Sequence, residues 1–183
     1  MRGPLFVVLA AIFVLPAAAQ EKIGLPASLI EDVFRKADCT NDAGEAVKKK
    51  HEVAGDLGGG LKLVDVSCSG GAYNFSSVLF AVDPAKPQEA RSLPFRHWED
   101  EHKGFRPTLA LTFPSYDEKT GRLRTHHKFR GPGDCGHAGL WRWNGMAFEM
   151  ERYWVKNKCD GDLFYPEENP AKFVVFPPRI RKK

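Results

Sequence analysis

A glycine-rich segment near the C-terminal end carries the pair of side chains with the most evident chemistry, Arg130 and Asp134. A carboxylate placed between Gly133 and Cys135 can accept N–H bonds from its own turn and so fix the shape of the loop. The Arg130 guanidinium can pair with that carboxylate, or it can present its fork of donors to an anionic ligand. We favour the structural role for Asp134 and retain both residues as candidate ligand contacts.

Histidines in the same half of the chain raise the question of a metal site. His126 and His127 are adjacent, and Asp134 and His137 follow shortly after them. Imidazole and carboxylate groups are common zinc ligands, but neighbouring residues of a strand point to opposite faces of a sheet. His126 and His127 therefore cannot both face one ion from a regular strand, and we predict neither a metal site nor a cofactor.

Carboxylates also suggest hydrolysis, because glycoside cleavage uses a pair of Asp or Glu residues. The run Glu99-Asp100-Glu101 supplies three carboxylates, but adjacent residues on a loop do not define the separation across a cleft that the reaction needs. A solvated charged loop is the favoured interpretation of this run. A hydrolase of cell-wall or polysaccharide material, using Asp134 or residues 99–101 with His137, is kept as an alternative.

Aromatic residues are concentrated around a predicted hairpin. Asn144-Gly145 is a strong hairpin signal, because both central residues of a type I′ turn need φ > 0. Trp141 and Trp143 precede this turn and share one face of their strand by the period of two. Burial against other strands is the favoured interpretation, and a stacking platform for sugar rings or a protein hot spot is the functional alternative.

A second glycine loop lies in the first half of the chain, at Ser69-Gly70-Gly71-Ala72-Tyr73, with Asn74 after it. Its pattern Ser-Gly-x-x-Tyr is similar to the loop that periplasmic inhibitors of c-type lysozyme insert into the enzyme's cleft. A glycine turn before a strand explains the same residues. Ser69, Tyr73 and Asn74 are therefore candidate partner contacts, and lysozyme inhibition is an alternative function.

The N-terminus has the form of a secretory signal, with Arg2, an apolar run from Leu5 to Leu15 and an Ala-x-Ala site. The run is shorter than the about 20 residues of a membrane span. We therefore predict cleavage after Ala19, a periplasmic location and no transmembrane anchor after cleavage. The formal net charge of +4 is too small to indicate nucleic acid as a partner. The basic tail, residues 177–183, is expected to be a solvated terminus.

The cysteines fit export. Cys39, Cys68, Cys135 and Cys159 form an even set, which in an oxidising compartment implies two disulfides. A catalytic thiol or a metal thiolate would need reduced sulfur. Of the three pairings we prefer Cys39–Cys68 with Cys135–Cys159, because each closes a short local loop, while the two pairings that cross the halves stay open.

Short elements must position these residues. Apolar residues at helical spacing predict a helix over 28–37, opened by Ser28 and Glu31 at the spacing of a capping box. The segments 56–60 and 117–121 are predicted turns, and 91–106 is predicted to connect the two halves. Strands are predicted at 45–53, 61–68, 73–82, 108–113, 122–129, 140–143, 146–155 and 172–176.

Residues 20–183 are predicted to form a single disulfide-stabilised, β-rich domain. Both halves run strand, turn, strand, glycine loop with cysteine, aromatic strand, which suggests half-repeats at 45–90 and 106–160. The predicted fold class is mostly β, α+β at most, with antiparallel meander sheets, one short N-terminal helix and two disulfides.

Several motifs recur in a specific order along the chain. They are Cys39, Gly71-Ala72-Tyr73-Asn74, Lys128, Arg130-Gly131, Gly133-Asp134-Cys135-Gly136, Trp141-x-Trp143-Asn144-Gly145, Phe148 and Cys159. In this order and spacing the chain resembles a secreted bacterial family called domain of unknown function 1176. The resemblance covers about residues 25–161 and implies a periplasmic address with no established activity. Phe129 and Asp160 depart from the family pattern, which usually has glycine and arginine there, and Leu163-Phe164-Tyr165 replaces a Trp-rich ending.

Export, nearly balanced charge and loops without a nucleophile–base pair favour a non-enzymatic binding module. Its partner is expected to be an envelope protein or glycan. The loops Ser69–Tyr73 and Arg130–Gly136 are predicted to form its recognition end.

Overall fold

A computed structural model of the protein describes residues 23–39 and 51–177. The predicted signal peptide with its cleavage site after Ala19 lies outside the described residues. So do residues 45–50 of the first predicted strand and all of the basic tail except Pro177. No helix in the described part of the chain is long and apolar enough to cross a membrane.

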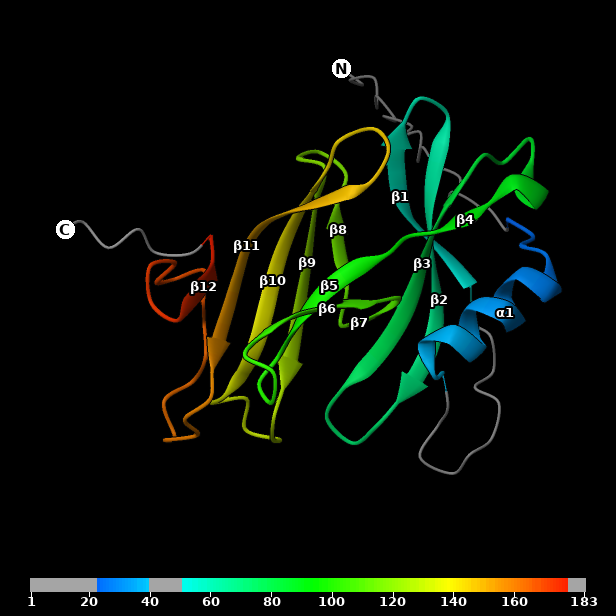
Figure 1. Cartoon of the computed structure of the whole chain (residues 1–183). Coiled ribbons are helices and arrows are strands. Elements are labelled where there is room, and N and C mark those ends of the chain that lie inside the picture. Colours follow the sequence, from blue (N-terminus) through cyan, green and yellow to red (C-terminus); the bar gives the residue numbers. More distant parts are fainter. Residues whose placement is uncertain (1–22, 40–50, 178–183) are drawn as a thin grey trace, which may run out of the picture.

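Strands dominate the described residues, as the sequence predicts, and they form two five-stranded antiparallel sheets and a separate two-stranded ladder (Figure 1). The first sheet contains β1 (His51–Gly58), β2 (Leu61–Gly70), β3 (Phe75–Val82), β4 (Arg91–Ser92) and β7 (Ala110–Thr112). The second contains β8 (Ser115–Asp117), β9 (Arg122–Lys128), β10 (Gly136–Trp143), β11 (Phe148–Lys156) and β12 (Val174–Phe176). The ladder pairs β5 (Phe95–Glu99) with β6 (Gly104–Thr108).

The first sheet is covered on both faces, which explains the unbroken apolar run in the second part of β3. All five residues from Val78 to Val82 are buried. Because side chains alternate along a strand, Phe80 joins the cluster that contains Ile30 of the helix α1 (Ala27–Ala37). Leu79 instead joins the cluster shared with the second sheet. In Figure 1, α1 lies on the side of the first sheet away from the second.

The main core lies between the two sheets and includes the β5–β6 ladder. Trp141 is 2% exposed and Tyr153 is 1% exposed, and the ring of Phe95 from β5 meets Trp141 edge-on at 5.7 Å. Phe105 of β6 contacts the Tyr153 ring at 5.3 Å. Aromatic rings of this size bury much of the apolar area that stabilises a small β domain.

The preferred disulfide pairing is confirmed. Cys39, after α1, is bonded to Cys68 on β2, and Cys135, immediately before β10, is bonded to Cys159 after β11. Each bond closes a local loop, of 29 and 24 residues of sequence separation respectively. The two pairings that cross the halves are excluded, and the helix is fixed to the sheet that it covers.

The prediction that 91–106 is only a connection is wrong, because this segment forms β4, β5 and most of β6. Phe95 of β5 belongs to the main core and Trp98 and Phe105 pack against it, and Lys103 with φ of 47° lies in the turn between β5 and β6. The acidic run is not simply solvated. Asp100 Oδ1 accepts hydrogen bonds from Trp98 Nε1 and from Asn157 Nδ2, both at 2.9 Å.

Three element boundaries also differ from the predictions. The helix begins at Ala27, with no side-chain cap, and the Pro26 carbonyl accepts the N–H groups of Leu29 and Ile30 instead of a capping box. β1 continues to Gly58, so the turn after it is shorter than 56–60. The strand predicted over 108–113 is divided, because the Thr108 hydroxyl bonds to both backbone groups of Ala110 and interrupts the ladder.

The remaining strand predictions locate the elements to within a few residues. The 172–176 segment pairs with β11 as β12, and the hairpin around Asn144-Gly145 joins β10 to β11. The predicted half-repeat 45–90 supplies β1 to β3 and the predicted half-repeat 106–160 supplies β8 to β11, but β7 of the second half-repeat pairs with β3. An internal duplication stays a prediction.

Gly136, at the start of β10, provides a test of this strand pairing. Its φ is 153°, and a Cβ at this position would lie 2.0 Å from the carbonyl oxygen of His127. We expect Gly136→Ala to lower the free energy of unfolding by at least about 3 kcal/mol, because backbone must move. Urea denaturation of the oxidised protein measures this change.

Gly104→Ala in β6 is the matched control. A Cβ there would meet nothing closer than 3.6 Å, so we expect a change within about 0.5 kcal/mol. Equal stability of the two variants would contradict the described approach of β9 to β10.

Candidate functional site

Asp134 is a buried, fully paired carboxylate in the loop between β9 and β10. Its side chain is 0% exposed. Arg130 donates from Nε to Oδ1 at 2.8 Å and from Nη2 to Oδ2, and the Gly161 N–H donates to Oδ2 at 2.7 Å. The Arg130 guanidinium holds the pKa of Asp134 well below its usual range, despite the opposing effect of burial. An ionised group held in this way suits a structural role and not that of a general acid.

The same loop anchors residues 160–168, which we call the wall segment. The Cys135–Cys159 disulfide fixes its beginning, and the Phe164 N–H donates to the Gly133 carbonyl at 3.2 Å. The Lys156 side chain is 4% exposed. Its Nζ donates to Asp160 Oδ1 and to the backbone carbonyl of Asp162, both at 2.6 Å. The glycine-rich cassette therefore positions a segment that lies about 30 residues further along the chain.

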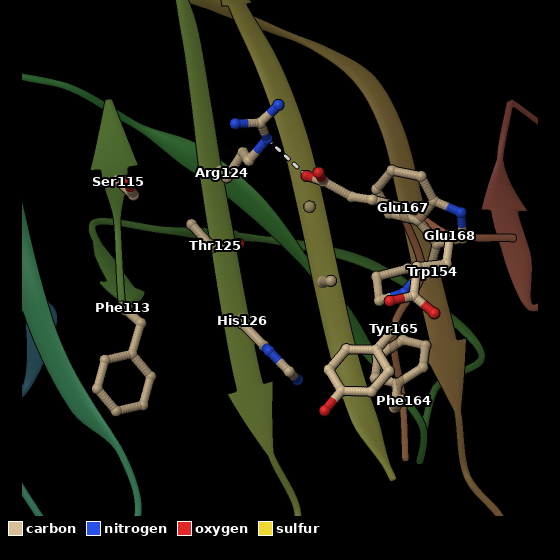
Figure 2. Close-up of a pocket in the computed structure, with 13 residues that line it drawn as sticks. Phe113, Ser115, Arg124, Thr125, His126, Trp154, Phe164, Tyr165, Glu167 and Glu168 are labelled. Carbon is tan, nitrogen blue, oxygen red and sulfur yellow. Dashed lines mark ion pairs between the residues drawn. The ribbon is translucent and has the colours of Figure 1, made fainter. Parts of the chain in front are cut away.

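The wall segment closes one side of a pocket of about 440 Å³ on the second sheet. Ala138, Trp154 and Phe164 are buried and form a cluster of their own, separate from the core between the sheets. The pocket therefore lies on the face of the second sheet turned away from the first. Figure 2 shows Phe113 and Tyr165 on the two sides of His126. These two rings are 37% and 55% exposed.

Polar groups supplement this aromatic lining. His126 Nε2 is buried and has no hydrogen-bond partner, and the His126 ring meets the Phe164 ring edge-on at 5.7 Å. Burial, with a smaller effect of the Lys128 charge, lowers the pKa of His126. Arg124 Nε pairs with a Glu167 carboxylate oxygen at 2.5 Å (Figure 2). The pocket thus offers apolar ring faces together with a neutral imidazole, a guanidinium and carboxylates.

The adjacent histidines face opposite sides of the sheet, as the strand period predicts. His126 lines the outer pocket, whereas His127 lines a second cavity of about 210 Å³ that also contacts His97 and His137. Burial lowers the pKa of His137 to about 3, with smaller contributions from the neighbouring imidazoles. Burial also raises the pKa of Tyr153, whose hydroxyl lies 2.7 Å from His137 Nδ1.

The two glycine loops predicted as the recognition end do lie together. A Cβ on Gly131 would lie 2.8 Å from the ring of Tyr73, so only glycine allows this approach. The Asn74 side chain donates to the Lys128 carbonyl at 2.9 Å and accepts the Lys128 N–H at 3.0 Å. These contacts join the β2–β3 hairpin of the first sheet to β9 of the second. Partner binding by this end stays a prediction.

Exposure differs among the predicted contact residues. Tyr73 is 56% exposed, whereas the Ser69 hydroxyl is part-buried and bonds to the Ser76 hydroxyl at 2.5 Å. Trp141 lies in the core, and Trp143 packs against it at the edge with the Arg91 guanidinium 5.7 Å from its ring centre. Lysozyme inhibition through the Ser69–Tyr73 loop is untested by this geometry.

Sequence reasoning missed the pocket residues. In the sequence, Leu163-Phe164-Tyr165 stands out only as a departure from the family pattern, although an aromatic pair inside a polar, acidic segment also indicates contact with an apolar surface. Phe113 is the last residue of the strand predicted over 108–113. No pattern in the sequence relates Phe113 or Tyr165 to His126, because these three residues come from different segments of the chain.

Among the residues that the structure describes, side-chain atoms of the kinds that can ligate a metal gather in one group of three. The group consists of Asp134, Cys135 and Cys159, whose donor atoms all lie within 4.8 Å of one another. Both sulfurs belong to the disulfide, so they are not thiolates. This group serves the fold.

The chain is similar to known proteins over most of its length. The model of a family described as "Protein of unknown function (DUF1176)" matches residues 8–174. A relative, "Uncharacterized protein YpfG" of Escherichia coli (strain K12), is 34% identical over 102 residues, which cover 54% of this chain. The chain spans 28% of the length of that relative. No solved structure matches the chain.

The Asp134 carboxylate predicts a specific acid sensitivity. Its folded pKa is lower than its unfolded value of about 3.9, so the unfolded chain takes up the proton first. The stabilisation is therefore present above about pH 4 and is lost as the pH falls below it. We expect Asp134→Asn to be less stable than the unsubstituted protein at neutral pH, and the two unfolding curves to converge in acid.

Urea denaturation over a series of pH values measures this convergence. Glu101→Gln, in the exposed turn between β5 and β6, is the control and should follow the unsubstituted protein throughout. A constant stability difference from neutral pH into acid would show that the charge of Asp134 contributes nothing.

Proposed function

The chain belongs to the family described as protein of unknown function DUF1176, and we propose that it is a non-enzymatic module that binds a sugar-ring ligand of the cell envelope. The proposed site is the pocket on the outer face of the second sheet. The observation that carries the proposal is the placement of Phe113 and Tyr165 on either side of a buried, unpartnered His126 Nε2. The two disulfides fit an exported protein, and we propose the periplasm as its location.

The aromatic lining suits a ligand whose ring has apolar faces and a polar edge. The C–H faces of a sugar ring pack on aromatic side chains, and its edge carries hydroxyl groups that need partners. Phe113 and Tyr165 leave a third and a half of their surfaces uncovered in the free protein. Covering them with a ligand would remove apolar surface from water, which stabilises a complex.

The polar groups of the pocket complement hydroxyl groups. A buried nitrogen without a partner is unfavourable, so a ligand hydroxyl that reaches His126 Nε2 satisfies both groups at once. Glu167 and Glu168 supply carboxylate oxygens that accept O–H donors. The Arg124–Glu167 ion pair holds one of these carboxylates in place. A neutral polyol matches this set better than a ligand of high charge.

Binding is favoured over hydrolysis by the state of the carboxylates. Asp134 is buried and paired with Arg130, and Glu99 contacts both His102, at 2.6 Å, and Arg106, at 3.3 Å. Glu167 and Glu168 are neighbours in one segment and do not face each other across a cleft, which is the arrangement that glycoside cleavage requires.

A thermal-shift panel would identify the ligand class. The probes are peptidoglycan fragments, neutral oligosaccharides and c-type lysozyme, each added to the oxidised protein. A ligand at about 100 Kd stabilises the folded state by about 2.7 kcal/mol. We expect a rise in Tm with a glycan, and titration of the intrinsic tryptophan fluorescence then gives its Kd, because Trp154 lies in the pocket.

Matched tyrosine variants locate the site. Tyr165→Ala should weaken glycan binding by about 10-fold, the loss expected for one stacked aromatic ring. Tyr73→Ala removes an equally exposed tyrosine outside the pocket and should leave the glycan Kd unchanged. No saturable glycan binding, or equal losses in both variants, would overturn the proposal. Lysozyme binding that Tyr73→Ala abolishes would support the inhibitor alternative instead.

A further inference from the structure

An exposed aromatic ring outside the pocket has no role in the packing of the protein. Phe75, the first residue of β3, is 59% exposed. It belongs to none of the three apolar clusters that the described residues form. Because most of its ring stays in water, this side chain adds little buried area to the stability of the fold.

Phe75 is continuous with the pocket through Phe113. The two rings meet edge-on at 5.8 Å, and the Phe113 N–H donates to the Phe75 carbonyl at 2.9 Å. Phe113 lines the pocket and is itself 37% exposed. Gly70 of β2 also lies against the Phe75 ring, since a Cβ there would come within 3.3 Å of it. The backbone bond and the neighbouring strand therefore hold Phe75 beside the pocket. Exposed apolar surface that is contiguous in this way is typical of an interaction site.

Phe75, Phe113 and Tyr165 thus form what we call the aromatic track, which passes from the first sheet to the second. Phe75 belongs to β3, Phe113 follows β7, and Tyr165 belongs to the wall segment. Figure 2 shows His126 between Phe113 and Tyr165, so a polar group interrupts the rings. Rings interspersed with hydrogen-bonding groups suit a polyol chain, whereas a protein interface is centred on a contiguous apolar core.

The wall segment determines the direction in which a long ligand leaves the pocket. This segment closes one side of the pocket, and the Phe164 N–H bond to the Gly133 carbonyl holds it against the sheet. On the opposite side Phe113 forms the border, and the next exposed ring beyond it is Phe75. A ligand longer than the pocket therefore continues past Phe113 and over Phe75.

We propose that the ligand is a linear glycan chain, with one part of the chain in the pocket and a linked sugar unit on Phe75. This assignment rests on the proposed function, because it extends the same site. Once the first part is bound, the linked unit reaches Phe75 at a high effective concentration. Its contact with the ring then adds affinity with little further loss of translational freedom. A glycan that only fills the pocket lacks this second contact.

Calorimetric titration with glycans of different length tests the assignment. The probes are the disaccharides and hexasaccharides of β-1,4-linked N-acetylglucosamine and of β-1,4-linked glucose, each titrated into the oxidised protein. We expect Phe75→Ala to weaken hexasaccharide binding by about 5-fold, the loss of one ring contact, and to leave the disaccharide Kd unchanged. Phe75→Tyr keeps the ring and should bind both lengths as the unsubstituted protein does.

Tyr73→Ala is the matched control. Tyr73 lies in the same hairpin, is 56% exposed, and has its ring against Gly131 instead of Phe113. This variant should leave the Kd of both lengths unchanged. Thermal unfolding verifies that each variant is folded.

The two glycan lengths separate failure of this assignment from failure of the proposed function. A preference for hexasaccharide that survives Phe75→Ala would come only from the larger number of binding registers in a longer chain, and it overturns the assignment. Equal losses of disaccharide and hexasaccharide affinity in Phe75→Ala overturn it as well, because Phe75 would then act only by supporting Phe113. In both cases disaccharide binding in the pocket leaves the proposed function standing. No saturable binding of any probe overturns both.

Discussion

The Asp134 carboxylate is the constraint that organises the end of the second sheet where β9 is joined to β10. A buried charge is tolerated only when it is paired and hydrogen-bonded, and Asp134 meets this requirement with the Arg130 guanidinium and the Gly161 N–H. The second of these partners belongs to the wall segment. Satisfying the charge therefore brings that segment against the sheet, and the Phe164 N–H bond to Gly133 and the adjacent disulfide keep it there.

The second sheet has distinct uses for its two faces, because side chains alternate along each strand. On β9, His126 turns towards the pocket closed by the wall segment, and His127 turns towards the cavity between the sheets. Leu123 and Trp141 on the inner face belong to the main core. One strand thus supplies a residue to each of the two cavities.

The conspicuous sequence motifs mainly build this scaffold. Asn74 connects the two sheets through both backbone groups of Lys128, and the close approach of Tyr73 requires a glycine at 131. Trp141 is core. The residues that remain available to a ligand, such as Phe113 and Tyr165, stand in less distinctive segments. The conspicuous motifs mark positions where the local geometry allows few residue types. The residues that can contact a ligand are those that the packing leaves exposed.

The sequence by itself determined the features that depend on local spacing. Alternation and turn residues predicted a mostly antiparallel β fold, the Asn144-Gly145 hairpin and the opposite facing of His126 and His127, and short loop closure favoured the observed disulfides. Only the tertiary structure decided that 91–106 forms strands and that His97 joins the stacked pair of histidines. These outcomes depend on which apolar faces pack together and on which buried polar atoms then lack partners, and such long-range contacts leave no periodic trace in the chain.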